Sequence, residues 1–320
     1  MRPGWRHPPL PNQSLLTHAL RALYSIAGVT LALHPAEADA PLSLPQAYHP
    51  FRAAESHSAH AEYHILNPDQ PRLPSLHPQH LHWSSEVWRM GSLPGNRIGI
   101  EIHHALRNLW VPVADLAPDF THGRIQPFAG RRADPSPYAL NYPYDQAILT
   151  NLLNRSRVIV LHASAIILEG RGWVFGGRSG IGKTTLSRLL RDHLGATLLN
   201  DDRCALYHDH GQWSVTPTPW HGEEPEIQHQ HAPLAGIVHL ERSPQPGTYA
   251  SLPPDLALPR LLATTIAPFY SQPDLTHTLD ALDHLIQHIP SFTFSFHPDS
   301  RAIEPFNNLR QTLYNQPHPS

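Results

Sequence analysis

The alternation of hydrophobic and polar residues is most regular in the second half of the chain, where it predicts strands and helices in turn. Val158–Leu168 is a long run rich in β-formers, and the turn signal Glu169–Gly172 leads from it into the apolar Trp173–Phe175. We therefore expect a hairpin here. A helix should follow from Thr185 and end at Gly195. Further strands are predicted at 197–200, 204–207, 212–217, 234–240 and 292–296, and further helices at 145–153, 255–267, 278–288 and 301–314.

The first half shows weaker periodicity. Residues 97–103 alternate strictly between apolar and polar, which predicts a half-buried strand. Strands are also expected at 109–113 and, as a short element, at 83–88. Residues 41–80 are rich in proline, histidine and alanine and favour loop, and 130–137 resembles a linker. The pattern thus predicts two units, a smaller domain at 1–140, mainly β or α+β, and an α/β domain at 141–320.

The N-terminal segment allows two interpretations. Leu16, Leu20, Leu23 and Ala27 lie at helical spacing, so we predict an amphipathic helix near residues 14–27 that Gly28 ends. The alternative is a signal peptide, because residues 22–33 are mostly apolar and residues 38–40 resemble a cleavage site. We favour the helix, followed by a strand over residues 29–33. No apolar run is long enough to span a membrane, so no membrane partner is expected.

Composition narrows the class of protein. Over 320 residues the net charge is −3 with no basic block, so we expect no nucleic-acid partner. The single cysteine, Cys204, cannot form an internal disulfide and fits a reducing compartment, so a cytoplasmic location is expected. The 26 histidines are spread along the chain without the ligand pattern of a zinc site.

The strongest motif is a phosphate-binding loop. Residues 177–184 match G-x-x-x-x-G-K-[ST] and lie between the predicted strand and helix. Glycines let backbone N–H groups converge on one phosphate, and the helix N-terminus adds its positive end. Lys183 is the only lysine among 23 Lys and Arg residues. The predicted nucleotide-binding residues are Gly177, Arg178, Ser179, Gly180, Ile181, Gly182, Lys183, Thr184 and Thr185.

A pair of acidic residues follows one helix later. Asp201 and Asp202 stand at the end of the predicted strand 197–200. One carboxylate at such a place can hold Mg²⁺, and a second can accept a proton from an attacking hydroxyl. The alternative is a solvated turn, since Asp-Asp-Arg is also common at strand ends. The spacing from the phosphate-binding loop favours the catalytic interpretation.

These motifs together resemble a known family. The run His162-Ala163-Ser164, a hairpin, the loop 177–184 and then residues 199–203, Leu-Asn-Asp-Asp-Arg, look like the catalytic domain of HPr kinase/phosphorylase. That family is related in fold to phosphoenolpyruvate carboxykinase, which implies a mixed, strand-rich α/β P-loop kinase core. The resemblance covers roughly residues 141–300, about half of the chain. The segment 218–223 also looks like one found in HPr kinase-like proteins.

The resemblance implies a role for each matching residue. Gly177, Gly180, Gly182 and Lys183 would cradle the ATP phosphates, and Thr184 and Asp201 would hold Mg²⁺. Asp202 would be the catalytic base. His162 would lie beside the aspartates and orient them, although a histidine in an apolar strand can also be a hydrogen-bonded core residue. Glu223 could approach the metal or substrate, but a solvated loop glutamate is the expected alternative.

The chain also departs from the family. Arg178 replaces the usual Asp after the first loop glycine, Ala163 replaces a Gly, and the downstream signature of the phosphorylase reaction is not found. We therefore expect an ATP- and Mg²⁺-dependent kinase that phosphorylates a serine of a small protein or peptide, and the sequence leaves open whether the reverse phosphorylase reaction occurs. A small-molecule hydroxyl kinase and a non-catalytic ATP-sensing module stay open as alternatives. The sequence also leaves open whether the chain forms a homo-oligomer.

Overall fold

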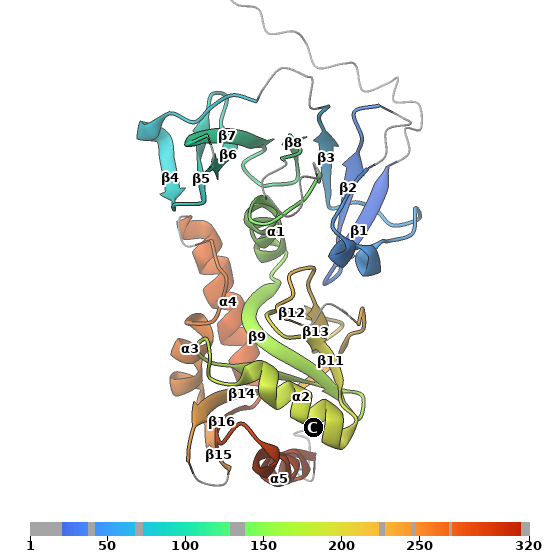
Figure 1. Ribbon diagram of the computed structural model, residues 1–320, viewed down its shortest axis with the longest axis vertical. Helices are drawn as coiled ribbons and strands as arrows, with labels where there is room; N and C mark the ends of the chain where they lie inside the picture. The colour runs from blue at the N-terminus through green and yellow to red at the C-terminus, as the bar shows by residue number, and fades with distance from the viewer. Residues whose placement is uncertain are drawn as a thin grey trace, which may run out of the picture.

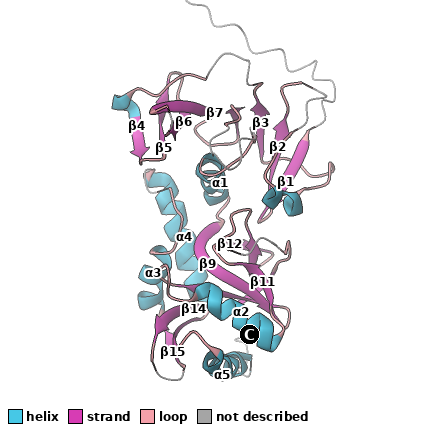
Figure 2. Ribbon diagram, in the orientation of Figure 1, coloured by secondary structure: helices cyan, strands magenta, loops and turns pink. Residues whose placement is uncertain are grey.

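Two sheets, one toward each end of the long axis of the molecule, form the framework of this mixed α/β chain (Figure 1). The structure is a computed structural model, and it describes residues 21–37, 42–67, 73–105, 107–128, 138–223, 228–244, 247–268 and 271–314. Strands outnumber helices over these residues, as Figure 2 shows. None of the described helices combines the length and the apolar character needed to cross a membrane.

The first sheet takes the strand order β1-β2-β3-β8-β7-β6-β5-β4. β3 runs parallel to β2 and to β8, and the other neighbours are antiparallel. The strands are β1 (Ala22–Ile26), β2 (Val29–His34), β3 (Ala61–Ile65), β4 (Leu81–Ser84), β5 (Trp88–Leu93), β6 (Arg97–His104), β7 (Leu109–Leu116) and β8 (His122–Ile125), with short 3-10 helices η2 (Gln46–Phe51) and η3 (Pro78–His80).

The predicted helix near residues 14–27 is wrong over the part that the structure describes. Residues 22–26 form strand β1, which pairs antiparallel with β2, and Ile26 lies opposite Val29. Ala27 and Gly28 both have positive φ, so they make the tight two-residue turn that joins hairpin strands. The backbone of 22–26 therefore bonds to β2 rather than to itself. Residues 14–20 lie outside the described residues.

The other predictions for the first half have mixed outcomes. The strands expected at 97–103 and 109–113 are confirmed as parts of β6 and β7. The segment 83–88 is instead the end of β4, a turn and the start of β5. β3 lies within 41–80, where loop was expected. The predicted linker 130–137 lies outside the described residues.

The second sheet contains the predicted hairpin of β9 (Ile159–Leu168) and β10 (Arg171–Gly176). Its order is β10-β9-β12-β13-β14-β16-β15, with β11 on β9. Because β10 also pairs with β14, five strands close into a ring around an apolar core. The remaining strands are β11 (Thr197–Asn200), β12 (Arg203–Asp209), β13 (Gln212–Pro217), β14 (Ala232–Arg242), β15 (Thr248–Leu252) and β16 (Ser291–Phe296).

The helices lie around this second sheet and between the sheets (Figure 1). They are α1 (Tyr144–Arg155), α2 (Lys183–Leu194), α3 (Pro254–Leu262), α4 (Gln272–His288) and α5 (Ile303–Tyr314), with the 3-10 helix η4 (Ser300–Ala302). The expected helix 255–267 stops at Leu262. The segment that follows lies along β9, where Thr264 and Val160 use their carbonyl oxygens to accept from His162 N and Ile266 N. Pairing with β9 thus replaces the last helical turn.

Helix α1 joins the two sheets. Its apolar residues pack into the core of the first sheet, together with Val160 and Ala205 from the second sheet and Trp220 from the segment after β13. At its start, the buried Asp145 accepts hydrogen bonds from the Tyr48 hydroxyl (2.7 Å) and from the Trp220 indole N–H (3.1 Å). Burial raises the pKa of Asp145, and these two donors oppose that shift. Residues beyond 140 therefore contribute to the core of the first sheet.

We expect Tyr48→Phe to lower the free energy of unfolding by about 1–3 kcal/mol, because the buried Asp145 would lose a donor while the ring still packs. Urea unfolding of both proteins measures this difference. Tyr24→Phe is the matched control, because the Tyr24 hydroxyl makes no hydrogen bond to the described residues. Equal losses in the two variants would show that the contact with Asp145 contributes nothing specific.

Candidate active site

The loop 177–182 connects the end of β10 to the start of α2, as the motif requires. Gly177 and Gly182 have φ of 149° and 116°, values that residues with a side chain rarely adopt. A Cβ on Gly182 would also lie 3.2 Å from the Phe296 ring. Ile181 is buried in the core beneath, so it anchors the loop, while Arg178 is exposed. The loop is therefore anchored to the core through Ile181, while its residues 178–180 are exposed to solvent.

Lys183 is the first residue of α2, and its side chain is only 7% exposed. Its Nζ donates to the carbonyl oxygens of Gly177 (2.9 Å) and Arg178 (3.4 Å). It also lies 3.4 Å from His162 Nε2 on β9. Burial lowers the pKa of Lys183, and the charge of Asp202 opposes that shift. Lys183 thus stabilises the curled conformation of its own loop and connects the loop to β9.

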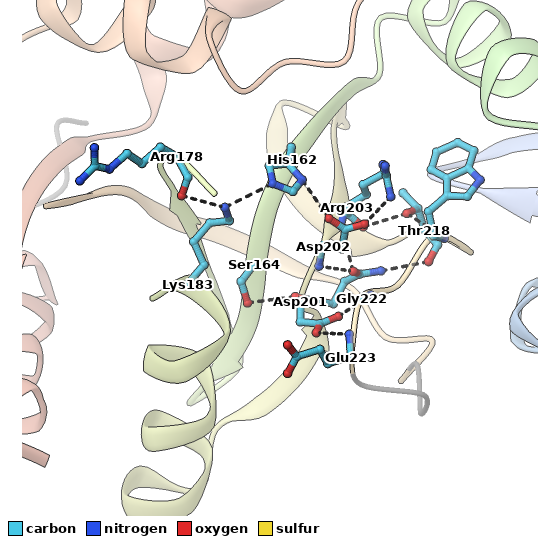
Figure 3. A network of polar contacts seen from close by, with 12 residues as sticks. His162, Ser164, Arg178, Lys183, Asp201, Asp202, Arg203, Thr218, Gly222 and Glu223 are labelled. Atoms are coloured by element: carbon cyan, nitrogen blue, oxygen red, sulfur yellow. Dashed lines mark hydrogen bonds and ion pairs between the residues drawn. The ribbon is translucent and has the colours of Figure 1, made fainter. Parts of the chain in front are cut away.

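His162 continues this connection to Asp202 (Figure 3). His162 lies opposite Arg203 in the β9–β12 pairing, and its Nδ1 is 2.9 Å from Asp202 Oδ1. With the proton on Nδ1, the imidazole donates to Asp202 and accepts from Lys183 through Nε2. The Arg203 guanidinium pairs with the other Asp202 oxygen. Burial alone would raise the pKa of Asp202, but the His162 hydrogen bond and the Arg203 charge hold it below its usual value.

Asp201 is held in a different way from its neighbour. Its side chain is 4% exposed, and its two oxygens accept from the backbone N–H groups of Gly222 and Glu223, each at 2.8 Å. The carboxylate of Glu223 is 76% exposed and pairs with Arg188, so it does not enter the site. Glu223 therefore contributes through its backbone.

Asn200 shapes the turn that contains the two aspartates. Its Oδ1 accepts from the backbone N–H groups of Asp202 and Arg203, and its Nδ2 donates to the Thr218 carbonyl (3.0 Å). Sequence analysis did not single out Asn200, although an asparagine before Asp-Asp is a signal for this kind of turn. Thr218 was likewise seen only as part of a resembling segment. Its hydroxyl donates to the Arg203 carbonyl, so the strand end is fixed from both sides.

The structure brings Lys183, His162 and Asp202 into one chain of contacts, with Asp201 in an adjacent backbone clamp. Thr184 is partly buried in the first turn of α2, and the loop residues named as nucleotide contacts, Arg178, Ser179 and Gly180, are exposed, as is Thr185. The single cysteine, Cys204, is a buried core residue. Over the described residues no three His, Cys, Asp or Glu side chains converge as metal ligands.

Comparison with solved structures finds similarity to a bacterial kinase/phosphatase over about half of this chain. A solved structure of the Hpr(Ser) kinase/phosphatase from Coxiella burnetii matches at a TM-score of 0.31 and 15% identity, over 48% of this chain and 92% of that chain. No protein-family model matches the chain, and no curated protein matches it. The assignment of roles in the site therefore depends on its geometry and its motifs.

The depressed pKa of Asp202 predicts a pH effect on stability. A carboxylate with a lowered folded-state pKa stabilises the fold above its unfolded pKa of about 3.9, and this contribution is lost as pH falls through the folded value. Wild-type protein should therefore lose more stability than Asp202→Asn as pH falls below about 4. Urea unfolding between about pH 7 and pH 3 measures the difference.

Asp209→Asn is the control for this titration, because Asp209 lies on the same strand β12 with its side chain 62% exposed. Its profile should follow the wild type. Equal losses of stability on acidification in wild type and Asp202→Asn would contradict a lowered pKa of Asp202 in the folded protein.

Proposed function

We propose that this chain is an ATP- and Mg²⁺-dependent kinase that transfers the γ-phosphoryl group to a serine hydroxyl of a small protein or peptide. The observation that carries the proposal is the contact chain from Lys183 through His162 to Asp202. It connects the lysine of a phosphate-binding loop to a carboxylate that can receive a proton. A loop that only bound phosphate would not need this connection.

The loop and its surroundings fit a nucleoside triphosphate with a divalent cation. Backbone N–H groups of 177–184 and the start of α2 offer donors for phosphate, and the Lys183 ammonium would exchange loop carbonyls for phosphate oxygens. Thr184 and Asp201 would hold Mg²⁺. A carboxylate has about four lone-pair positions, so Asp201 can bind a cation while it accepts two backbone hydrogen bonds. Mg²⁺ takes its remaining ligands from phosphate and water.

The transfer step uses the other aspartate. The substrate oxygen would attack the γ-phosphorus, the bond from that phosphorus to the β,γ-bridging oxygen would break, and ADP would leave as the hydroxyl proton passes to Asp202. His162 would hold Asp202 in position, and Arg203 would keep it ionised. A base with a low pKa contributes chiefly by positioning the hydroxyl, which suits a loose phosphoryl-transfer transition state. The proposal also implies a compartment that contains ATP, such as the cytoplasm.

Lys183→Ala should abolish detectable ATP turnover and weaken ATP binding strongly, because no other lysine can take its place. Calorimetric titration with MgATP and an assay of ADP release measure the two effects. Retained turnover in a folded Lys183→Ala protein would contradict the proposal.

Asp202→Asn should bind ATP as the wild type does but transfer phosphate roughly 100-fold or more slowly, as expected when a general base is lost. The assay uses radiolabelled ATP and the proteins or peptides encoded beside the gene. Asp209→Asn, on the same strand but exposed, should transfer normally. Normal transfer by Asp202→Asn would show that the base is another residue. Label on a metabolite, with none on protein, would instead indicate a small-molecule kinase.

A further inference from the structure

A cavity of about 270 Å³ lies beside the phosphate-binding loop, and no role has been assigned to it so far. It is formed where β14 and β16 end. These two strands run parallel to each other, and β14 runs parallel to β10, so all three end on the side of the sheet where the loop begins. Ligands of open α/β sheets bind outside such strand ends. The lining residues are Arg242, Ser243, Pro244, His297 and Pro298.

The wall of the cavity and the loop touch each other directly. Arg242 donates from its NH2 group to the carbonyl of Gly180 (2.9 Å) and from Nε to that of Ile181 (3.4 Å). A Cβ placed on Gly182 would lie 3.5 Å from Pro298. Ser243 N donates to the Phe296 carbonyl, which joins the two strand ends at 2.9 Å. The cavity therefore adjoins the loop directly, so one molecule can occupy both.

The cavity lies on the opposite side of β10 from the acidic residues. β10 has β9 on one side and β14 on the other. His162 and, through β12, Asp202 belong to the β9 side, whereas the cavity belongs to the β14 side. In a bound nucleotide the γ-phosphate and the nucleoside are at opposite ends. If the γ-phosphate points to Asp202, the nucleoside points to the cavity.

The lining groups suit a flat aromatic ring with polar edges. Pro244 and Pro298 give apolar surfaces, and the planar Arg242 guanidinium can stack on an aromatic ring. His297 adds a second ring, and its Nδ1 lies 3.0 Å from an Asp299 oxygen. The volume is slightly below that of pockets for drug-sized ligands, so it fits a base and its sugar rather than a complete nucleotide.

We propose that this cavity binds the nucleobase and sugar of the nucleotide whose phosphates occupy loop 177–184. This inference rests on the nucleotide-binding part of the proposed function and not on the transfer step. His297 and Ser243 then determine how much the base adds to affinity beyond the phosphates. The matching probe without a base is inorganic tripolyphosphate, which presents the same phosphate chain to the loop.

The test is calorimetric titration with MgATP and with magnesium tripolyphosphate. The proteins are wild type, His297→Ala and Ser243→Phe, and the exposed helix variant His193→Ala serves as control. Wild type should bind ATP more tightly than tripolyphosphate. His297→Ala, which removes the ring, and Ser243→Phe, which fills the cavity, should each weaken ATP binding about tenfold, the scale of one stacked base. Both should keep the wild-type affinity for tripolyphosphate, which also shows that each variant is folded.

Three outcomes would overturn the inference. If both cavity variants bind ATP as tightly as the wild type does, the base binds elsewhere. If the wild type binds ATP and tripolyphosphate equally tightly, the base contributes nothing to affinity. Failure of the wild type to bind either ligand would overturn this inference together with the nucleotide site itself. Tight ATP binding that depends on the cavity, without transfer to any acceptor, would support the cavity and count against the kinase proposal alone.

Discussion

A buried ammonium group is the constraint on which the site depends. Lys183 lies away from water, so its donors need partners, and it finds them in two carbonyls of its own loop and in His162. The two carbonyls hold the loop in its curled form. His162 can accept from the lysine only when its other nitrogen donates, and Asp202 accepts there. Arg203 then balances the charge of Asp202. One cation thus organises residues from the loop, β9 and β12.

The same site is attached to the first sheet. Trp220 is buried in the core of that sheet and donates to Asp145, while the chain two residues further on clamps Asp201 with its backbone. Tyr48 completes the connection from η2. The segment 220–223 is therefore held in the core of the first sheet at one end and bonded to the Asp201 carboxylate at the other, so it connects the two halves of the molecule. The first sheet is therefore part of what fixes the geometry of the site, although the chemical groups belong to the second half.

The sequence predicted best what depends on neighbouring residues. The hairpin before the loop, the end of α2 at Gly195 and the position of Lys183 follow from local turn and capping signals, and all are confirmed. Elements that depend on distant partners were missed. β3 and β8 are short and pair in parallel, so their own residues carry little signal. The clamp on Asp201 consists of backbone N–H groups, which no side-chain pattern reveals. The contact between His162 and Asp202, which the family resemblance implied, arises from the register between β9 and β12.

The solitary lysine has a consequence for the chemistry of the whole chain. Within this sequence Lys183 carries the only side-chain amine, and that amine is buried at the centre of the site. A protease that cleaves only after lysine can therefore cut one peptide bond, between Lys183 and Thr184, and would split the chain into residues 1–183 and 184–320. Acylation of side-chain amines likewise has a single target. Both reactions therefore act at the junction of the loop and α2 and nowhere else in this sequence.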